Sequence, residues 1–397
     1  MRYLFINAYS SKNRGDAGIV VGMIYLIKSI DPDADIQVMS SHWRENKKFY
    51  EQYGVSSIAP VWELEKEQKS VRRYINGVKS VLKVALKRRT KAIQAYQEAD
   101  MVLSVGGGYL YSSRKGPLGI GLLNSLFHLW VATKKGKKTL AFPQSVGPID
   151  SHIDKFIVKK VIKKLDLFIS REEISTKFLK ELRLNNVVEI ADIGFTLPSQ
   201  QVENWKNRNS SKLKVGLTLL DWRFAMKGIG DNEIDEYVSK VAEVCNRLSS
   251  KFSECSFYIF PQVTVGDGDT DYEVSKSLLQ KIHTENARIV NLDEFSNRPE
   301  ELVYLYGDMN LFIGSRMHST IFALAGGTPT IALAYQPKTK GTFKKLGLQD
   351  YVYDVHDFSI DEVYSNIENL IDTKNYPIGR VEEEIEQIRS TLKEKLS

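Results

Sequence analysis

The sequence predicts an α/β fold of two Rossmann-like domains with a cleft between them. Short apolar runs alternate with longer segments of helical pattern along most of the chain, which is typical of parallel sheets. A polar stretch rich in Asn and Ser, residues 199–212, interrupts this alternation and indicates a linker. A length of 397 residues suits two domains, and an interface between domains is a favoured place for a small-molecule site.

The first domain is expected to cover residues 1–200. It begins with a strand, continues through a glycine-containing loop at 10–18 and an apolar helix at 19–30, and has a further helix around 120–132. Its expected strands, each a short apolar run bounded by polar or glycine residues, are 3–8, 35–39, 101–105, 139–142, 167–170 and 187–190.

The second domain is expected to cover residues 213–375 and repeats the same alternation. Its expected strands are 214–219, 256–260, 287–291, 311–313 and 330–334. A charged tail, residues 376–397, follows it and carries a helical pattern over 381–396.

The composition is that of an ordinary globular protein, with 42% hydrophobic and 26% charged residues. No apolar run reaches the roughly 18 residues that a membrane span requires. The segment MRYLFINAYS at the start has the pattern of a strand and lacks that of a signal peptide. The two cysteines, Cys245 and Cys255, do not have the spacing of metal ligands, so we expect a cytoplasmic protein with reduced thiols.

Residues 66–91 contain ten Lys or Arg residues. These include Arg72, Arg73, Lys79, Lys83, Lys87, Arg88, Arg89 and Lys91, and apolar residues recur among them at roughly helical spacing. The pattern fits a basic amphipathic helix in peripheral contact with the anionic inner face of the cell membrane. It also fits a solvated helix that covers the edge of a core, which is the general rule for such charge runs. No nucleic acid partner is expected, because no recognition motif accompanies the charge.

The segment 314–341 predicts a binding site for an anion. Arg316 and His318 follow the expected strand 311–313 where it gives way to a helix, and Lys338 follows the next strand. The carboxyl edge of a parallel sheet is where open α/β sheets bind ligands. An Arg beside a helix amino terminus suits a phosphate or a carboxylate, and an imidazole can exchange a proton near neutral pH.

Three further loops of the first domain carry candidate binding residues. Asn13, Gly15 and Asp16 precede the first helix, where backbone amides can hold an anion and Asp16 either accepts from a substrate hydroxyl or caps the helix. The glycines 106–108, among them Gly107 and Gly108, either let a ligand approach the backbone or form a tight turn. Gln144 either hydrogen-bonds a substrate or belongs to a turn between prolines.

Strand ends supply the remaining candidates. Arg171 follows the expected strand 167–170 and either contacts a ligand or forms a surface ion pair. Asp192 either faces the cleft or forms a turn. Arg223, together with Asp221, closes the first strand of the second domain and is a further candidate for an anion contact.

Together these motifs resemble the polysaccharide pyruvyl transferase family. The motifs that carry the resemblance are Asn13-x-Gly15-Asp16, Gly106-Gly-Gly108, Gln144-Ser-Val-Gly-Pro148, Ser170-Arg171-x-x-x-Ser175, Ala191-Asp192, Phe260-Pro-Gln262 and Arg316-x-His318 through Pro329 to Lys338. One departure is Glu172, where the family usually has Asp.

The resemblance implies a fold similar to two-domain, GT-B-like glycosyltransferases. It also implies transfer of pyruvate from phosphoenolpyruvate onto two hydroxyls of a sugar, giving a cyclic ketal in a surface polysaccharide or glycoconjugate. The second domain would then bind the donor, with Arg316, His318 and Lys338 at the phosphoenolpyruvate site and His318 as the acid, and the first domain would bind a sugar or a lipid-linked oligosaccharide.

Two other functions fit the same fold and stay open from the residues alone. One is a glycosyltransferase that uses a nucleotide sugar, and the other is a non-catalytic sugar-binding or scaffold protein of a glycan assembly complex. A dehydrogenase is disfavoured, since the dinucleotide fingerprint is missing. No metal and no cofactor are expected, because the sequence shows no ligand cluster and phosphoenolpyruvate is a co-substrate.

Overall fold

A computed structural model describes residues 1–64, 70–113, 116–202, 213–224, 229–266, 269–292 and 298–396. Part of the expected linker, residues 203–212, and the first residues of the basic segment, 66–69, lie outside the described residues. In the described part of the chain, no helix combines the length and the apolar character needed to cross a membrane.

Internal contacts divide the chain into two compact units. Unit 1 consists of Met1–Ser11, Ile19–Ile193 and the residues from Thr391 onward, and unit 2 consists of Lys12–Gly18 and Gly194–Ser390. The functional division into 1–200, 213–375 and 376–397 stays a prediction.

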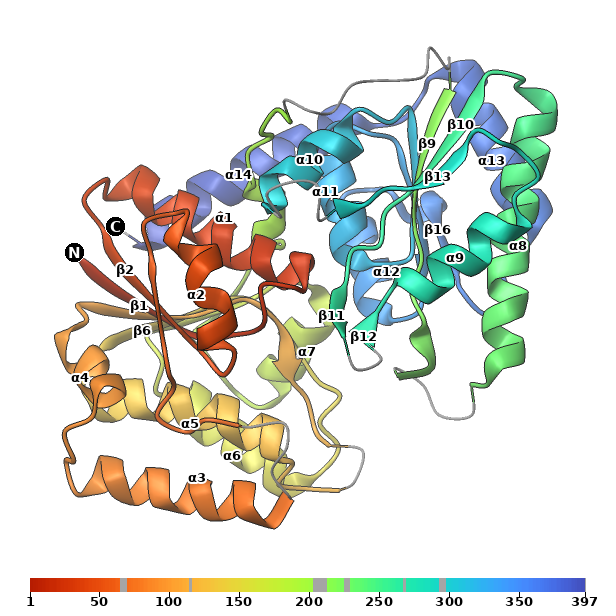
Figure 1. The fold of residues 1–397 in the computed structure, drawn as a ribbon. Helices are drawn as coiled ribbons and strands as arrows, with labels where there is room; N and C mark the ends of the chain where they lie inside the picture. The colour runs from red at the N-terminus through yellow and green to blue at the C-terminus, as the bar shows by residue number, and fades with distance from the viewer. Residues whose placement is uncertain are drawn as a thin grey trace. The chain divides into compact units, whose positions relative to one another are not determined.

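Unit 1 is built on a parallel sheet with helices on both faces (Figure 1). The strand order is β3 (Ser56–Ile58), β2 (Asp35–Ser40), β1 (Arg2–Ala8), β4 (Met101–Ser104), β6 (Lys138–Val146), β7 (Leu167–Ser170) and β8 (Val187–Glu189), with β5 (Gly107–Leu110) paired to β6. The helices are α1 (Arg14–Ile30), α2 (Trp43–Glu51), α3 (Ser70–Ala85), α4 (Lys91–Glu98), α5 (Ile120–Lys134), α6 (His152–Ile162) and α7 (Glu173–Glu181).

Unit 2 is built on a second parallel sheet, in the order β13 (Ala287–Ile289), β10 (Cys255–Ile259), β9 (Leu213–Thr218), β14 (Leu311–Gly314), β15 (Thr330–Ala334) and β16 (Val352–Asp354). A small antiparallel pair, β11 (Thr264–Gly266) and β12 (Asp269–Thr270), lies outside it. The helices are α8 (Asp231–Lys251), α9 (Tyr272–Lys281), α10 (Pro299–Gly307), α11 (Met317–Ala325), α12 (Pro337–Lys345), α13 (Ile360–Thr373) and α14 (Ile378–Leu396). The predicted class, an α/β fold of two parallel Rossmann-like halves, is confirmed.

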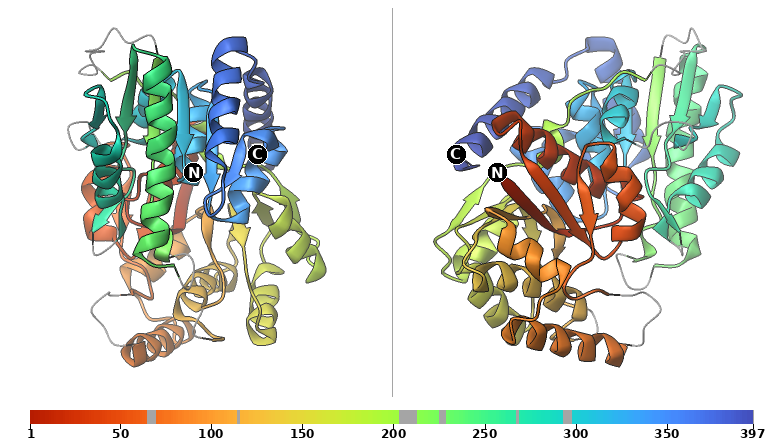
Figure 2. Two further views of the ribbon diagram at one scale, coloured as in Figure 1. Left: turned by 90° about the vertical axis from the view of Figure 1, so that its right-hand side faces the viewer. Right: turned by 60° about the vertical axis from the view of Figure 1, so that its left-hand side comes forward.

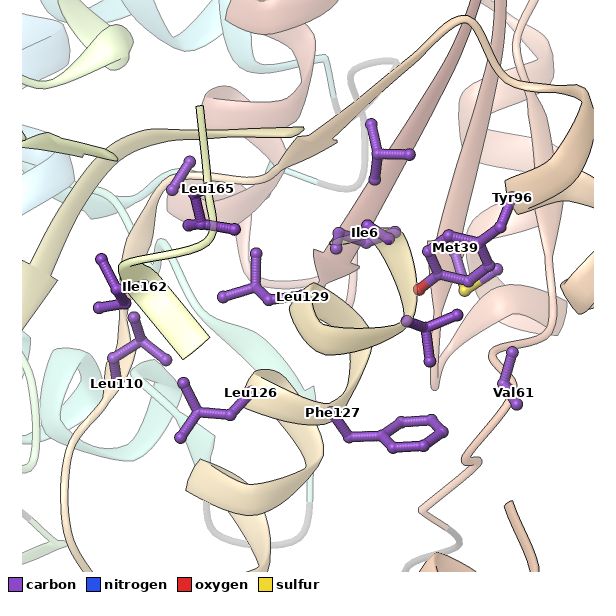
Figure 3. Close-up of a cluster of buried hydrophobic side chains, with 14 of the residues drawn as sticks. Ile6, Met39, Val61, Tyr96, Leu110, Leu126, Phe127, Leu129, Ile162 and Leu165 are labelled. Carbon is purple, nitrogen blue, oxygen red and sulfur yellow. The ribbon is translucent and has the colours of Figure 1, made fainter. Parts of the chain in front are cut away.

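The central strands are buried on both faces, as expected for parallel sheets covered by helices. Every residue of β4, β9, β10, β14 and β15 is buried. In unit 1, the core between the sheet and the helices α4, α5 and α6 is one contiguous apolar cluster. Figure 3 shows it in close-up, with side chains that include Ile6, Met39, Tyr96, Leu126, Phe127 and Leu129.

Two loops expected in the first domain are regular structure instead. The helix α1 begins at Arg14, not at residue 19, because the side chain of Asn13 accepts hydrogen bonds from the amides of Gly15 (3.2 Å) and Asp16 (3.3 Å). This cap compensates for the weak helix propensity of a glycine-rich start.

The second is the pair of motifs around Gly107 and Gln144. Gln144 lies inside β6, and Gly107 opposes it in β5. A Cβ on Gly106 would lie 2.6 Å from the carbonyl oxygen of Pro143, so glycine is needed where the two backbones approach. The pairing of β6 with β7 is irregular between Ala141 and Gln144, which brackets Pro143, a residue without an N–H for the ladder.

Candidate functional site

The strongest predicted pair, Arg316 and His318, lies where the central strand β14 of unit 2 meets α11. Arg316 is the residue before the helix and His318 belongs to its first turn. Two contacts of Ser315 hold this turn in place. Its amide donates to the carbonyl of Thr218 on β9 (2.9 Å), and its hydroxyl lies 2.5 Å from the hydroxyl of Tyr237 on α8. A cation and an imidazole therefore stand at a helix amino terminus, where backbone amides attract anions.

Arg316 is held by Asp271, the residue that precedes α9. Its Nε and Nη2 donate to the Oδ1 of Asp271 at 3.1 and 2.5 Å. The carboxylate is fully buried while the Arg316 side chain keeps 13% of its exposure, and the second carboxylate oxygen accepts from the amide of Val263 (2.9 Å). Asp271 thus fixes the orientation of the guanidinium. An Arg that is already oriented loses little conformational entropy when it forms a further hydrogen bond.

Arg223, a further predicted anion contact, binds two carboxylates. Its guanidinium donates to Asp221 and to Asp231. The hydrogen bond from Arg223 is the largest cause that holds the pKa of Asp221 below its ordinary value, and the charge of Arg316 acts in the same direction. Asp221 and Arg316 therefore share one electrostatic environment.

Lys338 lies in the first turn of α12, directly after β15. Because β14 and β15 are parallel neighbours, α11 and α12 begin at the same edge of the sheet. The structure thus places Arg316, His318 and Lys338 at one edge of the sheet, as the sequence predicted.

The segment Lys12–Gly18 belongs to unit 2 by its contacts and lies against this edge. A Cβ on Gly15 would come within 2.5 Å of the Nδ1 of His318, so the imidazole packs directly on the backbone of the first turn of α1. Asp16 is partly exposed in the same turn. The capping side chain is that of Asn13.

Arg14 ties this segment to the chain that follows β10. Its side chain is buried and its Nη1 donates to the carbonyl of Gln262 (3.3 Å) and to the hydroxyl of Thr264 (3.1 Å). Asn13 and Val263 add a backbone bridge. The contacts of Arg14 and Asp271 both converge on residues 262–264, so one loop positions the two sides of the candidate site.

Neither Arg14 nor Asp271 was singled out from the sequence. Arg14 occupies the variable position of the motif Asn13-x-Gly15-Asp16. Asp271 looks like an ordinary Asp before a helix, where such residues are common. The signal that could have identified Asp271 is its place after the loop that begins with Phe260-Pro-Gln262, but its partner Arg316 is 45 residues away.

In unit 1, Arg171 is fully engaged in a buried cluster. Its Nη1 donates to Asp192 at 2.6 Å, its Nε donates to the hydroxyl of Ser145 at 2.7 Å, and both charged side chains are at most 2% exposed. Glu172, the departure from the family pattern, caps α7 by accepting from the amide of Ser175. Arg171 belongs to unit 1 and Arg316 to unit 2.

The remaining unit 1 candidates lie near the end of the same strands. Gln144 is buried and its Nε2 donates to the carbonyl of Ser145 (3.3 Å). Gly107 has a φ of +129°, a conformation that strongly favours glycine, and Gly108 is exposed. Tyr109 donates its hydroxyl to the carbonyl of Val105 (2.6 Å), which fits a packing role.

No group of three or more His, Cys, Asp or Glu side chains suited to a metal ion is present among the residues that the structure describes. The unit 2 cluster offers two cations, an imidazole and the amides of a helix start.

Comparison with known proteins places the chain in a biosynthetic context. A family model described as polysaccharide pyruvyl transferase matches residues 13–337. The amylovoran biosynthesis protein AmsJ of Erwinia amylovora is 23% identical over 415 residues, which cover 98% of this chain and 94% of AmsJ.

Solved structures resemble the fold at low identity. HepE of Anabaena, solved with UDP and glucose, has a TM-score of 0.60 and 13% identity, with 100% of this chain and 99% of HepE covered. The UDP-GlcNAc 2-epimerase of Neisseria meningitidis, bound to UDP-GlcNAc, has a TM-score of 0.59 and 12% identity, with 100% and 99% covered. These similarities confirm a GT-B-like fold and establish the fold alone.

Proposed function

Since the chain belongs to the polysaccharide pyruvyl transferase family, and is therefore a pyruvyltransferase, we propose that its donor is phosphoenolpyruvate and that its product is a cyclic ketal on a sugar. The observation that carries the proposal is the pairing of Arg316, anchored by Asp271, with His318, packed on Gly15, at the start of α11. The relative AmsJ is named for amylovoran biosynthesis, which supports an exopolysaccharide or other cell-envelope glycan as the product.

Phosphoenolpyruvate carries a carboxylate and a phosphate, so it requires several cations. Arg316 offers a planar fork and Lys338 a point charge at the same sheet edge, and the amides at the start of α11 add partial positive charge. Because Asp271 holds Nε and Nη2 of Arg316, the orientation of the guanidinium is fixed before the donor binds. Arg223 and Arg171 are further proposed donor contacts, and each is also held by a carboxylate.

In the proposed reaction, His318 gives a proton to the methylene carbon of phosphoenolpyruvate and C2 becomes electrophilic. One sugar hydroxyl attacks C2 and loses its proton, and the second hydroxyl then displaces phosphate and loses its proton as the ring closes. General acid catalysis at the first step contributes roughly 10²- to 10⁴-fold. Arg316 and Lys338 stabilise the charge of the departing phosphate, and no cofactor takes part.

We assign the acceptor to the remaining candidates. These are Asn13, Gly15 and Asp16 beside His318, and Gly107, Gly108 and Gln144 at the edge of the unit 1 sheet. Asp16, partly exposed one residue from Gly15, is the proposed acceptor of a sugar hydroxyl proton or hydrogen bond. We propose a cytoplasmic reaction on a sugar or a lipid-linked oligosaccharide.

Isothermal calorimetry with phosphoenolpyruvate tests the donor site. The parent protein should bind, and Arg316→Ala should weaken binding by about 2 kcal/mol, roughly 30-fold, as for loss of a hydrogen bond to a charged group. A matched control is Arg247→Ala, which removes an exposed Arg of the same unit that pairs with Glu243 and Asp361. The control should bind as the parent does.

Two outcomes would contradict the proposal. Binding of a nucleotide sugar in place of phosphoenolpyruvate would favour a glycosyltransferase of the same fold. Full retention of function in Arg316→Ala and His318→Ala would favour a non-catalytic sugar-binding or scaffold role.

A further inference from the structure

Helix α3 packs on unit 1 through a narrow face of small and polar residues. Gly77, Ser80 and Val84 are its buried positions. A Cβ on Gly77 would lie 2.5 Å from the Trp62 ring, and the hydroxyl of Ser80 donates to the carbonyl of Val61 (3.1 Å). The core edge is therefore covered without the large apolar residues of the helix.

Those large residues face outward instead. Seven of the fifteen large hydrophobic side chains that are exposed in the described part of the chain lie on or just after α3: Val71, Tyr74, Ile75, Val78, Val81, Leu82 and Leu86. Val71, Val78 and Leu86 are 70%, 62% and 66% exposed. We call these seven residues the outer apolar face. Such a concentration on one helix marks an interaction surface.

Basic residues occupy the rest of the exposed surface of α3. With a turn of about 100° per residue, Arg72, Lys79 and Lys83 fall on the side of the helix away from Val78 and Leu82, between the buried face and the outer apolar face. Lys87, Arg88 and Arg89 follow the helix end, and residues 70–97 contain no Asp or Glu. The surface is thus apolar and cationic, without acidic residues to balance it.

The apolar surface continues from α3 through two hydrogen-bonded contacts. The Tyr74 hydroxyl donates to the carbonyl of Leu118 (2.9 Å), and the amide of Leu118 donates to Asp154 on α6 (2.8 Å). Leu118 is itself exposed, as are Ile153 and Phe156 on either side of Asp154. Lys160 lies over the Phe156 ring at 5.4 Å, which repeats the association of apolar and basic side chains.

Helix α3 forms an outer edge of unit 1 in all three views, where no described helix or strand of the same unit covers its outer side (Figures 1 and 2). We propose that the outer apolar face, with Leu118, Ile153 and Phe156, docks on the surface of an anionic lipid bilayer. Apolar side chains enter the boundary between headgroups and acyl chains, and the flanking Lys and Arg contact anionic headgroups while their stems lie along the apolar surface.

The positive charge around the outer apolar face favours an anionic lipid surface over a second copy of this chain as the partner. A second copy of this chain would present the same cationic surface, and like charges would then face each other. An anionic bilayer can bind the outer apolar face and the basic residues of α3 at the same time, and each basic residue near the surface adds to the attraction. The inference goes beyond the reaction and does not depend on the identity of the donor.

Vesicle flotation tests the proposal on the full chain. The probes are phosphatidylcholine vesicles with and without about 30% phosphatidylglycerol, because binding to anionic lipid should dominate at roughly 0.1 M salt. We expect the parent to float with the anionic vesicles only. Val78→Ser with Leu82→Ser, and separately Lys79→Gln with Lys83→Gln, should each lower the bound fraction at equal lipid at least tenfold.

A matched control lies on α7, which exposes Ile174, Lys177 and Lys180. The variant Ile174→Ser with Lys177→Gln and Lys180→Gln should float as the parent does. Since the changed α3 side chains are exposed, all variants should keep the parent's thermal midpoint and its binding of phosphoenolpyruvate, so failure here is separate from failure of the proposed function.

Absence of parent flotation, or flotation that the α3 variants retain, would overturn the proposal. Light scattering after gel filtration supplies the remaining outcome. If the parent is a dimer that the α3 variants convert to a monomer, and vesicles do not bind, then a second copy covers this face and the lipid assignment is wrong.

Discussion

The imidazole of His318 occupies the space that a side chain on residue 15 would need. A Cβ there would meet Nδ1 at 2.5 Å and the ring carbon Cγ at 2.8 Å. Real side chains do not pack so closely, so either the ring or the start of α1 would have to move. Gly15 and His318 are thus one structural unit, even though they are far apart in the sequence, and the glycine sets where the proposed acid stands.

We expect Gly15→Ala to lower kcat for pyruvyl transfer by about 10- to 100-fold, since a displacement of the order of 1 Å at a reacting group costs this much. Binding of phosphoenolpyruvate by calorimetry should change by less than about threefold, because Arg316 stays on Asp271. Alanine is itself favourable in a helix, so helix propensity does not account for a loss of activity.

The matched control is Gly379→Ala. Gly379 is the second residue of α14, as Gly15 is of α1, but a Cβ on it meets nothing within 4 Å. Its variant should keep the parent's kcat. Equal kcat values for both alanine variants and the parent would show that the ring position of His318 is irrelevant to catalysis.

Asp271→Asn should weaken binding of phosphoenolpyruvate by about 3- to 10-fold. The neutral amide no longer pairs with Arg316, so donor binding must pay roughly 0.5–1.5 kcal/mol to order that side chain. Stability should also fall by about 1.5–3 kcal/mol, as for a buried hydrogen bond to a charged group. Calorimetry and urea unfolding measure the two effects separately.

Asp235→Asn is the control for Asp271→Asn, because Asp235 pairs with Lys281 on the exposed side of α8. Neither affinity nor stability should change beyond about 0.5 kcal/mol. Tighter binding of phosphoenolpyruvate by Asp271→Asn would contradict the positioning role and would mean that the carboxylate mainly opposes the charge of the donor.

Most strands were predictable because their signal is local. Strands such as β9 and β14 are buried on both faces, so their apolar runs are continuous. Short edge strands carry no such run: β3 is Ser56–Ile58 and β16 is Val352–Asp354. Their pairing depends on the neighbouring strand, which a local pattern does not encode.

Helix α3 shows what a local pattern leaves open. Its spacing predicts an amphipathic helix, and it fits both a membrane surface and a core edge. The structure shows that the core side consists of Gly77, Ser80 and Val84, so the apolar residues are exposed. Which face packs was decided by Trp62, whose ring needs a glycine opposite it. The anchoring of Arg316 by Asp271 was missed for the same reason, since contacts between distant segments leave no local signal.

Burial of His128 predicts loss of stability in mild acid. Desolvation lowers the pKa of His128 to about 4 from an ordinary value of 6.5, and its ring accepts or donates at 3.0 Å to the buried Tyr96 hydroxyl. The unfolded state therefore binds the proton between pH 6.5 and 4, and stability is complete above this window and falls as the pH decreases through it. The expected loss is about 2 kcal/mol from pH 7 to pH 5, measured by urea unfolding.

His128→Gln removes this titration while keeping a polar side chain near Tyr96. It should be less stable than the parent at pH 7, and its free energy of unfolding should decrease less between pH 7 and pH 5, by about 2 kcal/mol. Parallel pH profiles for the two proteins would rule out His128 as the source of the acid sensitivity.

Because Arg171 and Asp192 form a buried ion pair, changing one partner should lower the free energy of unfolding more than changing both. Both side chains are at most 2% exposed, so Asp192→Asn leaves a buried charge and should cost about 3–5 kcal/mol in urea unfolding. Arg171→Met with Asp192→Leu removes both charges and should recover at least half of that loss. The exposed counterpart, Asp361→Asn beside Arg247, should stay within about 0.5 kcal/mol of the parent.

The double variant also decides what Arg171 does. If its charge serves only to balance Asp192, the refolded double variant binds phosphoenolpyruvate as the parent does. If Arg171 contacts the donor, calorimetry should show a loss of about tenfold or more that restored stability does not repair. The free energy of unfolding of Arg171→Met and of Asp192→Leu alone supplies the last comparison. If the two losses add up in the double variant, then packing around Ser145 and not charge pairing stabilises this strand end.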